Sequence, residues 1–147
     1  MDTATEPLES RIRASFARQS MLATLRATLD EVTEGRCVIS APLLPETRQQ
    51  HGAGHAGATF TLVDTAAGYA ALTLIPPGTE VMTAEMKINL LSPAIGDRLI
   101  AAMQAGLAQG AARVHHQPRV AAHQLQRHVA VRGHDHHRIL LRQQGGG

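Results

Sequence analysis

The sequence predicts an α+β domain in which an antiparallel sheet wraps around one central helix. Three stretches support this prediction. Residues 57–74 are small or apolar on nearly every side, which is typical of a buried helix. Residues 27–43 hold two short β-type runs around Glu34 and Gly35, and residues 81–91 alternate apolar and polar side chains as a strand does. A length of 147 residues fits one structural domain.

The remaining elements follow from the same patterns. Apolar residues near the N-terminus recur at mostly helical spacing and predict an amphipathic helix: Leu8, Ile12, Phe16, Leu22 and Leu25. The hairpin is expected to end at the prolines that follow it, and "GDRLIAA" begins a further strand. The central helix is expected to bury a stripe formed by Phe60, Val63, Ala67, Ala70 and Leu74. The alternating strand after it is expected to end at Pro93.

Composition limits the class of protein. The N-terminus alternates charged and apolar residues and lacks both a signal-peptide block and a run long enough to span a bilayer, so we expect a cytoplasmic protein with no membrane association. The single cysteine, Cys37, excludes an internal disulfide. Because it lies in the strand-like run "RCVISAPL" with no activating motif, we expect it to be a small buried hydrophobe.

Charge is distributed unevenly along the chain. Residues 1–98 carry eight basic and eleven acidic side chains, a net charge of −3, whereas residues 99–147 carry six basic and one acidic, a net charge of +5. Seven of the nine histidines also lie in the second part. A nucleic-acid partner is disfavoured, because three aromatic residues in the whole chain make no stacking platform. We also expect no metal site in the histidine-rich segment "GHDHH".

One carboxylate stands alone in the predicted central helix. Asp64 is the only formally charged side chain between Arg48 and Glu80. Burying a charge is costly, so a chain that keeps one in an apolar segment usually has a use for it. The sequence therefore predicts a functional role for Asp64, with a satisfied structural carboxylate as the alternative.

Several separated blocks carry a resemblance to a known family. "QQHGAGHAGATFTLVDTAAGYAAL", followed by "PPGTEVMTAEMKINLLSPAIGDRL", resembles the hotdog-fold acyl-CoA thioesterases of the PaaI-like group over about residues 9–101. The family pattern is an Asn or Gln, a Gly, His-Gly-Gly, an Asp nine residues after that His, and a strand of the type T-x-E-x-K-I-N-x-L-x-P. The resemblance implies the hotdog fold, hydrolysis of an acyl-CoA thioester to a free acid and coenzyme A, and no cofactor.

The resemblance also implies roles for individual residues. Asp64 falls on the catalytic carboxylate, a general base or nucleophile, and Gly57 on the glycine whose backbone N–H polarises the thioester carbonyl. Four further positions fall on substrate-binding residues of the pattern: Gln49, Gly52, His55 and Thr83. The chain departs from the pattern where Ala56 replaces the first glycine and Gln49 stands where many members have Asn. Because His55 lies at the helix entry, capping is its favoured role over that of a base.

The chemistry agrees with these positions and adds a constraint on assembly. A helix N-terminus offers free N–H groups to the oxyanion that develops on a thioester carbonyl. Gly57 and Asp64, however, are separated by seven residues, or about 10 Å along a helix, whereas both must lie roughly 3 Å from the reacting atoms. Two antiparallel central helices would bring Gly57 of one subunit to Asp64 of the other. We therefore expect a homodimer, or a dimer of dimers, with shared sites.

Two other functions are weighed against hydrolysis. A non-catalytic acyl-CoA-binding hotdog protein would keep the fold but would gain nothing from Asp64. A hotdog dehydratase or hydratase would use a histidine on the helix together with a carboxylate. Here His55 precedes the helix and Asp64 holds its middle, which argues against that reaction.

The resemblance stops near the end of the "GDRLIA" strand. Residues 1–101 are predicted to form the hotdog domain, and residues 102–147 form a tail rich in His, Gln and Arg that lacks sustained alternation. If the codons that can encode Gly133–Arg138 are read from their second base, they can encode V-M-T-T-T. The codons for residues 110–117, read in the same way, can encode G-R-R-V-S-T-T. Both peptides fit the C-terminal pieces that the family has and this chain lacks, and they occur in the same order. These observations indicate a shifted reading frame. Because the affected strands lie inside the family's sheet, we expect disrupted C-terminal strands and reduced stability.

We predict that resequencing the coding DNA will reveal an insertion or deletion near codons 100–104. The charge change, the histidine excess and the two recoverable motifs all arise together if the frame shifts there. An intact frame through these codons would contradict this interpretation.

Overall fold

The structure, a computed structural model, describes residues 7–83, 86, 88 and 90–105, together with the backbone of three short strands at 120–121, 129–132 and 138–141. In chain order the elements are α1 (Leu8–Phe16), α2 (Ser20–Thr24), β1 (Thr28–Thr33), β2 (Arg36–Pro42), the 3-10 turn η1 (Pro45–Thr47), α3 (Ala56–Leu72), β3 (Glu80–Val81), β4 (Arg98–Gln104), β5 (Val120–Ala121), β6 (Val129–Arg132) and β7 (Arg138–Leu141).

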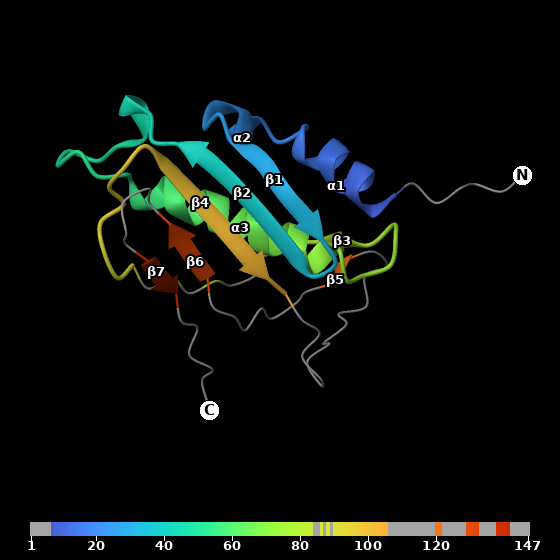
Figure 1. Cartoon of the computed structure of the whole chain (residues 1–147). Coiled ribbons are helices and arrows are strands. Elements are labelled where there is room, and N and C mark those ends of the chain that lie inside the picture. Colours follow the sequence, from blue (N-terminus) through green and yellow to red (C-terminus); the bar gives the residue numbers. More distant parts are fainter. Residues whose placement is uncertain are drawn as a thin grey trace, which may run out of the picture.

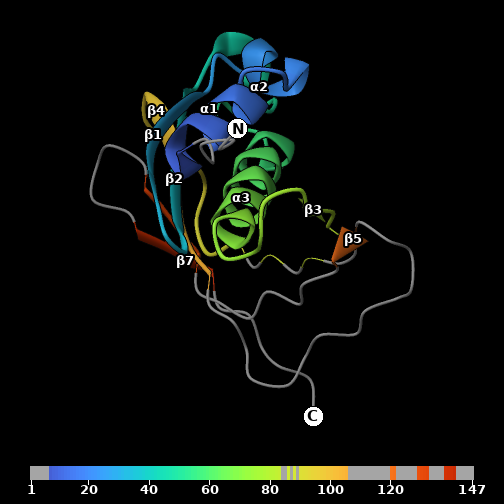
Figure 2. The same cartoon turned by 90° about the vertical axis from the view of Figure 1, so that its right-hand side faces the viewer.

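The main sheet has the strand order β1-β2-β4-β6-β7, and every neighbouring pair is antiparallel. The helix α3 lies along one face of this sheet, beneath β2 and β4 (Figure 1), and β3 lies on the other side of the helix (Figure 2). Side chains from α3, β2 and β4 form one core with Ile12 and Leu22 from the N-terminal helices. This arrangement confirms the predicted α+β class with a sheet on a central helix.

The hairpin turn forms at the expected residues. Gly35 has φ +71°, which a residue with a side chain rarely adopts, and a Cβ there would lie 3.0 Å from the Ala105 carbonyl oxygen. The Ala105 N–H donates to the Gly35 carbonyl at 2.6 Å, and the Gly35 N–H donates to Thr73 Oγ1 at 2.7 Å. The turn therefore ties the hairpin to the end of β4 and to the C-terminal end of α3.

The central helix is buried on most sides, as predicted, but Phe60 is not. Val63, Ala67 and Ala70 are buried, whereas Phe60 is 43% exposed. Phe60 belongs to a stripe that the main sheet does not cover, formed by Gly57, Phe60, Asp64 and Gly68, all exposed or half-buried. We call this the open stripe of α3. The expectation for Phe60 was wrong because an all-round apolar pattern does not reveal which side of a helix its own sheet covers.

The N-terminal segment forms two helices, α1 and α2, where the spacing predicted one. Their separation follows from the six-residue step between Phe16 and Leu22, which rotates the apolar stripe around a continuous helix. Gln19 is extended at this break, with φ −84° and ψ 100°. Ile12, Leu22 and Leu25 still reach the core, so the expected burial of the apolar residues holds.

In the alternating segment 81–91 the described residues show little of the predicted strand. Val81 belongs to β3 (Glu80–Val81), which pairs with β5 over two positions. The described residues that follow are not in a strand, and Met82 and Leu90 are 66% and 50% exposed. An alternating pattern needs a neighbouring backbone to become a strand, and among the described strands of the main sheet none pairs with this segment. Ala84, Glu85, Lys87 and Asn89 of this segment lie outside the described residues.

The predicted burial of Cys37 is confirmed. Cys37 has no exposed surface, and burial, followed by the nearby Glu31 carboxylate, raises the pKa of its thiol from 9.0 to about 12. A thiol with this pKa forms very little thiolate near neutral pH, so it is a packing residue.

We predict that iodoacetamide will not alkylate Cys37 in the native protein at about pH 8, because thiolate and access are both lacking. The same reagent should modify it in guanidinium chloride, where the pKa returns toward 9.0. Mass spectrometry of both samples would check this. Rapid modification of the folded protein would contradict the buried position.

Candidate functional site

Asp64 lies in the middle of α3, on the open stripe, and is half-buried. Its Oδ1 accepts a hydrogen bond of 2.6 Å from Thr83 Oγ1, which lies just beyond β3. The contact joins residues nineteen positions apart in the sequence. Thr83 thus fixes one carboxylate oxygen, and Oδ2 receives no hydrogen bond from the residues that the structure describes. The structure brings these two predicted site residues together.

The N-terminus of α3 is capped by a histidine side chain. His55 occupies the N-cap position, and its Nδ1 accepts a 2.9 Å hydrogen bond from the Gly57 N–H. The His55 carbonyl accepts from the N–H groups of Ala58 and Thr59. This is the capping role that the sequence favoured for His55. It also means that the Gly57 N–H, the expected oxyanion donor, already has a partner.

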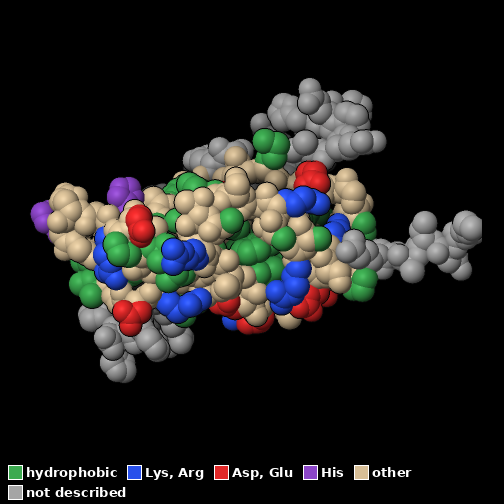
Figure 3. Space-filling view, turned by 90° about the horizontal axis from the view of Figure 1, so that it is seen from above, with side chains coloured by type: hydrophobic (Ala, Val, Ile, Leu, Met, Phe, Trp, Pro, Cys, Tyr) green, Lys and Arg blue, Asp and Glu red, His purple; other side chains and the backbone are tan. Residues whose placement is uncertain are grey.

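The loop that precedes α3 holds the other predicted residues. Gln49 is half-buried, its N–H donates to the Ala53 carbonyl at 2.8 Å, and its Oε1 accepts from the His51 N–H. Gly52, with φ +86°, donates its N–H to the Gln49 carbonyl at 3.0 Å. Gln49 and Gly52 are therefore joined directly, in one loop that leads to His55. Figure 3 shows the described histidines gathered at this end of the molecule.

Arg48 anchors this loop, a role that the sequence did not indicate. Its guanidinium donates to the carbonyls of Gly52 at 2.8 Å, Leu43 at 3.0 Å and Gly96 at 3.2 Å. The guanidinium thus ties both sides of its own loop to the distant Gly96, which is 48 positions away. Local sequence patterns do not reveal this role, because all three acceptors are backbone oxygens and one of them belongs to a distant segment.

Within one chain the predicted residues form two groups at different places along α3. Gln49, Gly52, His55 and Gly57 lie at or before its N-terminus. Asp64 and Thr83 lie beside its middle. Seven residues of helix, about 10 Å, separate Gly57 from Asp64. A single chain therefore does not bring the carboxylate and the Gly57 N–H to one carbonyl group.

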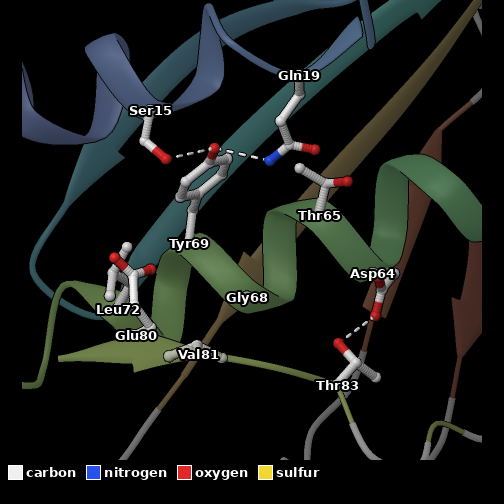
Figure 4. A pocket seen from close by; sticks show the side chains of 10 residues that line it. All are labelled: Ser15, Gln19, Asp64, Thr65, Gly68, Tyr69, Leu72, Glu80, Val81 and Thr83. Carbon is white, nitrogen blue, oxygen red and sulfur yellow. Dashed lines mark hydrogen bonds between the residues drawn. The ribbon is translucent and has the colours of Figure 1, made fainter. Parts of the chain in front are cut away.

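A cavity of about 400 Å³ adjoins Asp64 and Thr83. It also reaches Ser15 and Gln19 from the N-terminal segment, Tyr69 on α3 and Glu80 on β3 (Figure 4). This volume lies in the range of small-molecule sites. The sequence analysis did not identify Ser15, Gln19 or Glu80, because no local motif marks them and the cavity forms only where separate elements pack together.

Comparison with known proteins shows the family and the fold of the chain. The family model described as "Domain of unknown function (DUF4442)" matches residues 11–139. The chain belongs to this family. No curated protein sequence matched it.

Solved structures show which fold this DUF4442 chain has. It is similar to a thioesterase family protein from Silicibacter pomeroyi, with 29% identity, a TM-score of 0.72, and coverage of 92% of this chain and 91% of that one. It is also similar to the E. coli PaaI protein from the phenylacetic acid degradation operon, with 20% identity, a TM-score of 0.69 and coverage of 91% and 87%. The fold is therefore the hotdog fold of thioesterase-family proteins, as the sequence resemblance implied.

A third structure includes a ligand. A hypothetical thioesterase protein from Streptococcus pneumoniae, solved with coenzyme A, is 18% identical, with a TM-score of 0.59 and coverage of 78% of this chain and 79% of that one.

The described part of this chain has no group of three metal-ligating side chains, and none of its helices is long and apolar enough to cross a membrane. The segment "GHDHH" lies outside the described residues.

The His55 cap yields a prediction for stability. His55→Ala removes the acceptor for the Gly57 N–H and should lower the free energy of unfolding by about 1 kcal/mol, whereas His55→Asn keeps a capping acceptor and should lose less. Denaturant unfolding of both variants would measure the difference. Equal losses would show that the cap adds nothing to stability.

Proposed function

We propose that this chain is an acyl-CoA thioesterase that hydrolyses a thioester to a free acid and coenzyme A. The observation that supports this most strongly is the Asp64–Thr83 pair beside the cavity, a carboxylate with one oxygen held and the other oxygen available. A half-buried carboxylate in such a position can act as a general base. The likeness to a thioesterase family protein at 29% identity points to the same chemistry.

In this proposal Asp64 activates the attacking water. Oδ2 accepts a proton from water as the water oxygen bonds to the thioester carbonyl carbon. The carbon–sulfur bond then breaks, and the coenzyme A sulfur leaves and is protonated. The alternative is direct attack by the Asp64 carboxylate, giving an anhydride that water hydrolyses. In both routes Thr83 orients the carboxylate through its 2.6 Å hydrogen bond.

The oxyanion is assigned to the N-terminus of α3. Its N–H groups and the positive end of the helix dipole stabilise negative charge on the carbonyl oxygen. The Gly57 N–H points at His55 Nδ1 at 2.9 Å, so the carbonyl oxygen has to take the place of that ring nitrogen. Gly57 is exposed and has no Cβ, which leaves room for this exchange.

Two subunits are needed to complete the site. The separation of about 10 Å between Gly57 and Asp64 is removed when a second α3 lies antiparallel to the first around a twofold axis. The open stripe supports this arrangement, because Gly57, Phe60 and Asp64 all lie on the side of α3 that its own sheet leaves uncovered. We therefore propose a homodimer, or a dimer of dimers, in which Gly57 of one subunit works with Asp64 of the other.

The assignment of Asp64 predicts a large loss of activity. In this chain, or in its frame-restored form, Asp64→Ala should lower thioester hydrolysis about 100-fold or more, the usual size of a general-base contribution. Thr83→Val keeps the Asp64 carboxylate but removes its hydrogen bond, and the rate of thioester hydrolysis should fall about tenfold. Release of free thiol from acyl-CoA esters measures both, with the exposed Asp30→Ala as the control.

Two results would contradict the assignment. Full turnover by a well-folded Asp64→Ala variant would show that another group activates water. If Asp64→Asn binds acyl-CoA as the unmodified chain does, and neither protein hydrolyses it, the chain is a binding protein.

The shared site predicts complementation between two inactive variants. Asp64→Ala and Gly57→Val, mixed so that subunits exchange, should form heterodimers in which one of the two sites has both good residues. Statistical mixing makes about half of the dimers hetero, so about a quarter of the unmodified activity should return. Co-purification of differently tagged subunits would verify exchange. Heterodimers without activity would mean that Asp64 works with donors of its own chain.

A further inference from the structure

The cavity beside Asp64 has a polar end that the proposed hydrolysis does not use. The hydroxyl of Tyr69, a residue only 5% exposed, accepts a hydrogen bond of 2.7 Å from Gln19 Nε2 and donates one of 3.1 Å to Ser15 Oγ. The Tyr69 ring is held in addition by Phe16, with 6.2 Å between the ring centroids. Figure 4 shows the three polar side chains above α3, on the same cavity as Asp64. We call them the Tyr69 trio.

The Tyr69 trio keeps unused hydrogen-bonding capacity. The Gln19 amide turns its nitrogen to the tyrosine, so its oxygen faces away from it (Figure 4). Within the described part of the chain, no group donates to that oxygen and none accepts from the Ser15 hydroxyl. One acceptor and one donor therefore remain for a ligand. A hydroxyl group satisfies both, because it donates one hydrogen bond and accepts others.

The position of the trio sets a length for the ligand. Tyr69 follows Asp64 by five residues on α3, a rise of about 7.5 Å along the helix axis, and five residues also turn about 140° around that axis. The rise is therefore the shortest distance that a ligand has to span between them. An extended chain advances about 3.3–3.6 Å for every three bonds, so an acyl group whose carbonyl carbon lies at Asp64 needs about six bonds or more to reach the trio.

The charge of the cavity sets a further condition. Asp64 and Glu80 both line it, and no lysine or arginine is among the described residues of its wall. The nearby Arg11 guanidinium binds the Leu72 carbonyl oxygen at 3.4 Å. Placing a like charge beside a carboxylate is unfavourable, so an acyl group that ends in a carboxylate fits poorly.

We propose that this cavity selects acyl groups with a neutral hydroxyl about six bonds or more from the thioester carbonyl, bound by Gln19 and Ser15 beside Tyr69, and rejects acyl groups that end in a carboxylate. This inference rests on the proposed thioesterase function, because it takes Asp64 as the place of the carbonyl. It goes beyond that function in naming the substrate class and the residues that select it.

The test compares three coenzyme A thioesters of equal chain length, with hexanoyl, ω-hydroxyhexanoyl and adipoyl groups, and repeats the comparison with the eight-carbon and ten-carbon sets. Their non-hydrolysable ketone analogues, in which a methylene group separates sulfur from carbonyl, are titrated calorimetrically, and the thioesters are assayed by thiol release. In the set whose length fits the cavity, the hydroxylated analogue should bind about tenfold more tightly than the unsubstituted analogue, and the dicarboxylic analogue about tenfold more weakly.

Variants assign the selection to the cavity. Gln19→Leu and Ser15→Ala should each abolish most of the preference for the hydroxyl, measured as the ratio of the dissociation constants of the hydroxylated and unsubstituted analogues. Glu80→Gln should reduce the rejection of the dicarboxylic analogue. Gln104→Leu, an exposed position on β4 outside the cavity, is the matched control and should change neither ratio. Circular dichroism checks that the variants fold. If Gln19→Leu does not fold, Ser15→Ala alone tests whether the trio binds the hydroxyl.

The outcomes separate the two proposals. Equal binding of the hydroxylated and unsubstituted analogues at all three lengths, or binding of none of the analogues, overturns the assignment of the cavity. Hydrolysis of hexanoyl-CoA without any hydroxyl preference leaves the thioesterase function intact and refutes this inference. A hydroxyl preference that Gln19→Leu removes, in a protein that hydrolyses none of the thioesters, supports the cavity assignment and refutes the thioesterase function.

Discussion

The main sheet covers only one side of α3, and this one-sided burial determines where Asp64 and the cavity lie. The helix packs against β2 and β4, and its residues Leu62, Ala66 and Ala70 are almost fully buried. A sheet can cover only one side of a helix, so a stripe of α3 faces away from it (Figure 2). Asp64 lies on that stripe. The helix thus buries its apolar surface and still presents a carboxylate to a cavity, without the cost of a fully buried charge.

The first turn of α3 serves stability and the proposed chemistry with the same N–H group. His55 Nδ1 satisfies the Gly57 N–H, one of the donors that a helix start leaves unpaired. An oxyanion would need that same donor. In the proposed mechanism the carbonyl oxygen of the substrate replaces the His55 imidazole as the acceptor for the Gly57 N–H. Part of the free energy that the substrate gains from this hydrogen bond therefore offsets the loss of the His55 cap. The residue that stabilises the helix start therefore also competes with the substrate.

Sheet pairing becomes shorter toward the C-terminal strands. β2 and β4 pair from Arg36↔Gln104 to Pro42↔Arg98, whereas β4 and β6 pair only from Ile100↔Arg132 to Ala102↔Ala130. In the main sheet β6 lies beside β4, and β7 beside β6. The segment after β3 adds no strand at the β7 edge among its described residues. The shifted reading frame remains a prediction, and the coding DNA decides it.

Local elements could be predicted from the sequence alone: the hairpin turn at Gly35, the central helix with Asp64 in it, and the strand that "GDRLIAA" begins. Each depends on neighbours within a few residues, and helical or strand periodicity records those neighbours directly. The His55 cap was predictable for the same reason, because an N-cap bonds a group two positions away.

Only the tertiary structure decided which of these residues meet. Thr83 reaches Asp64, Gln19 reaches Tyr69, and Arg48 joins three turns through contacts that span up to fifty positions. No periodic pattern records such contacts, since they depend on how separate elements pack. The length of β3 was decided in the same way, because a strand forms only where another backbone accepts and donates its hydrogen bonds. Sequence therefore placed the carboxylate on its helix, and packing decided what surrounds it.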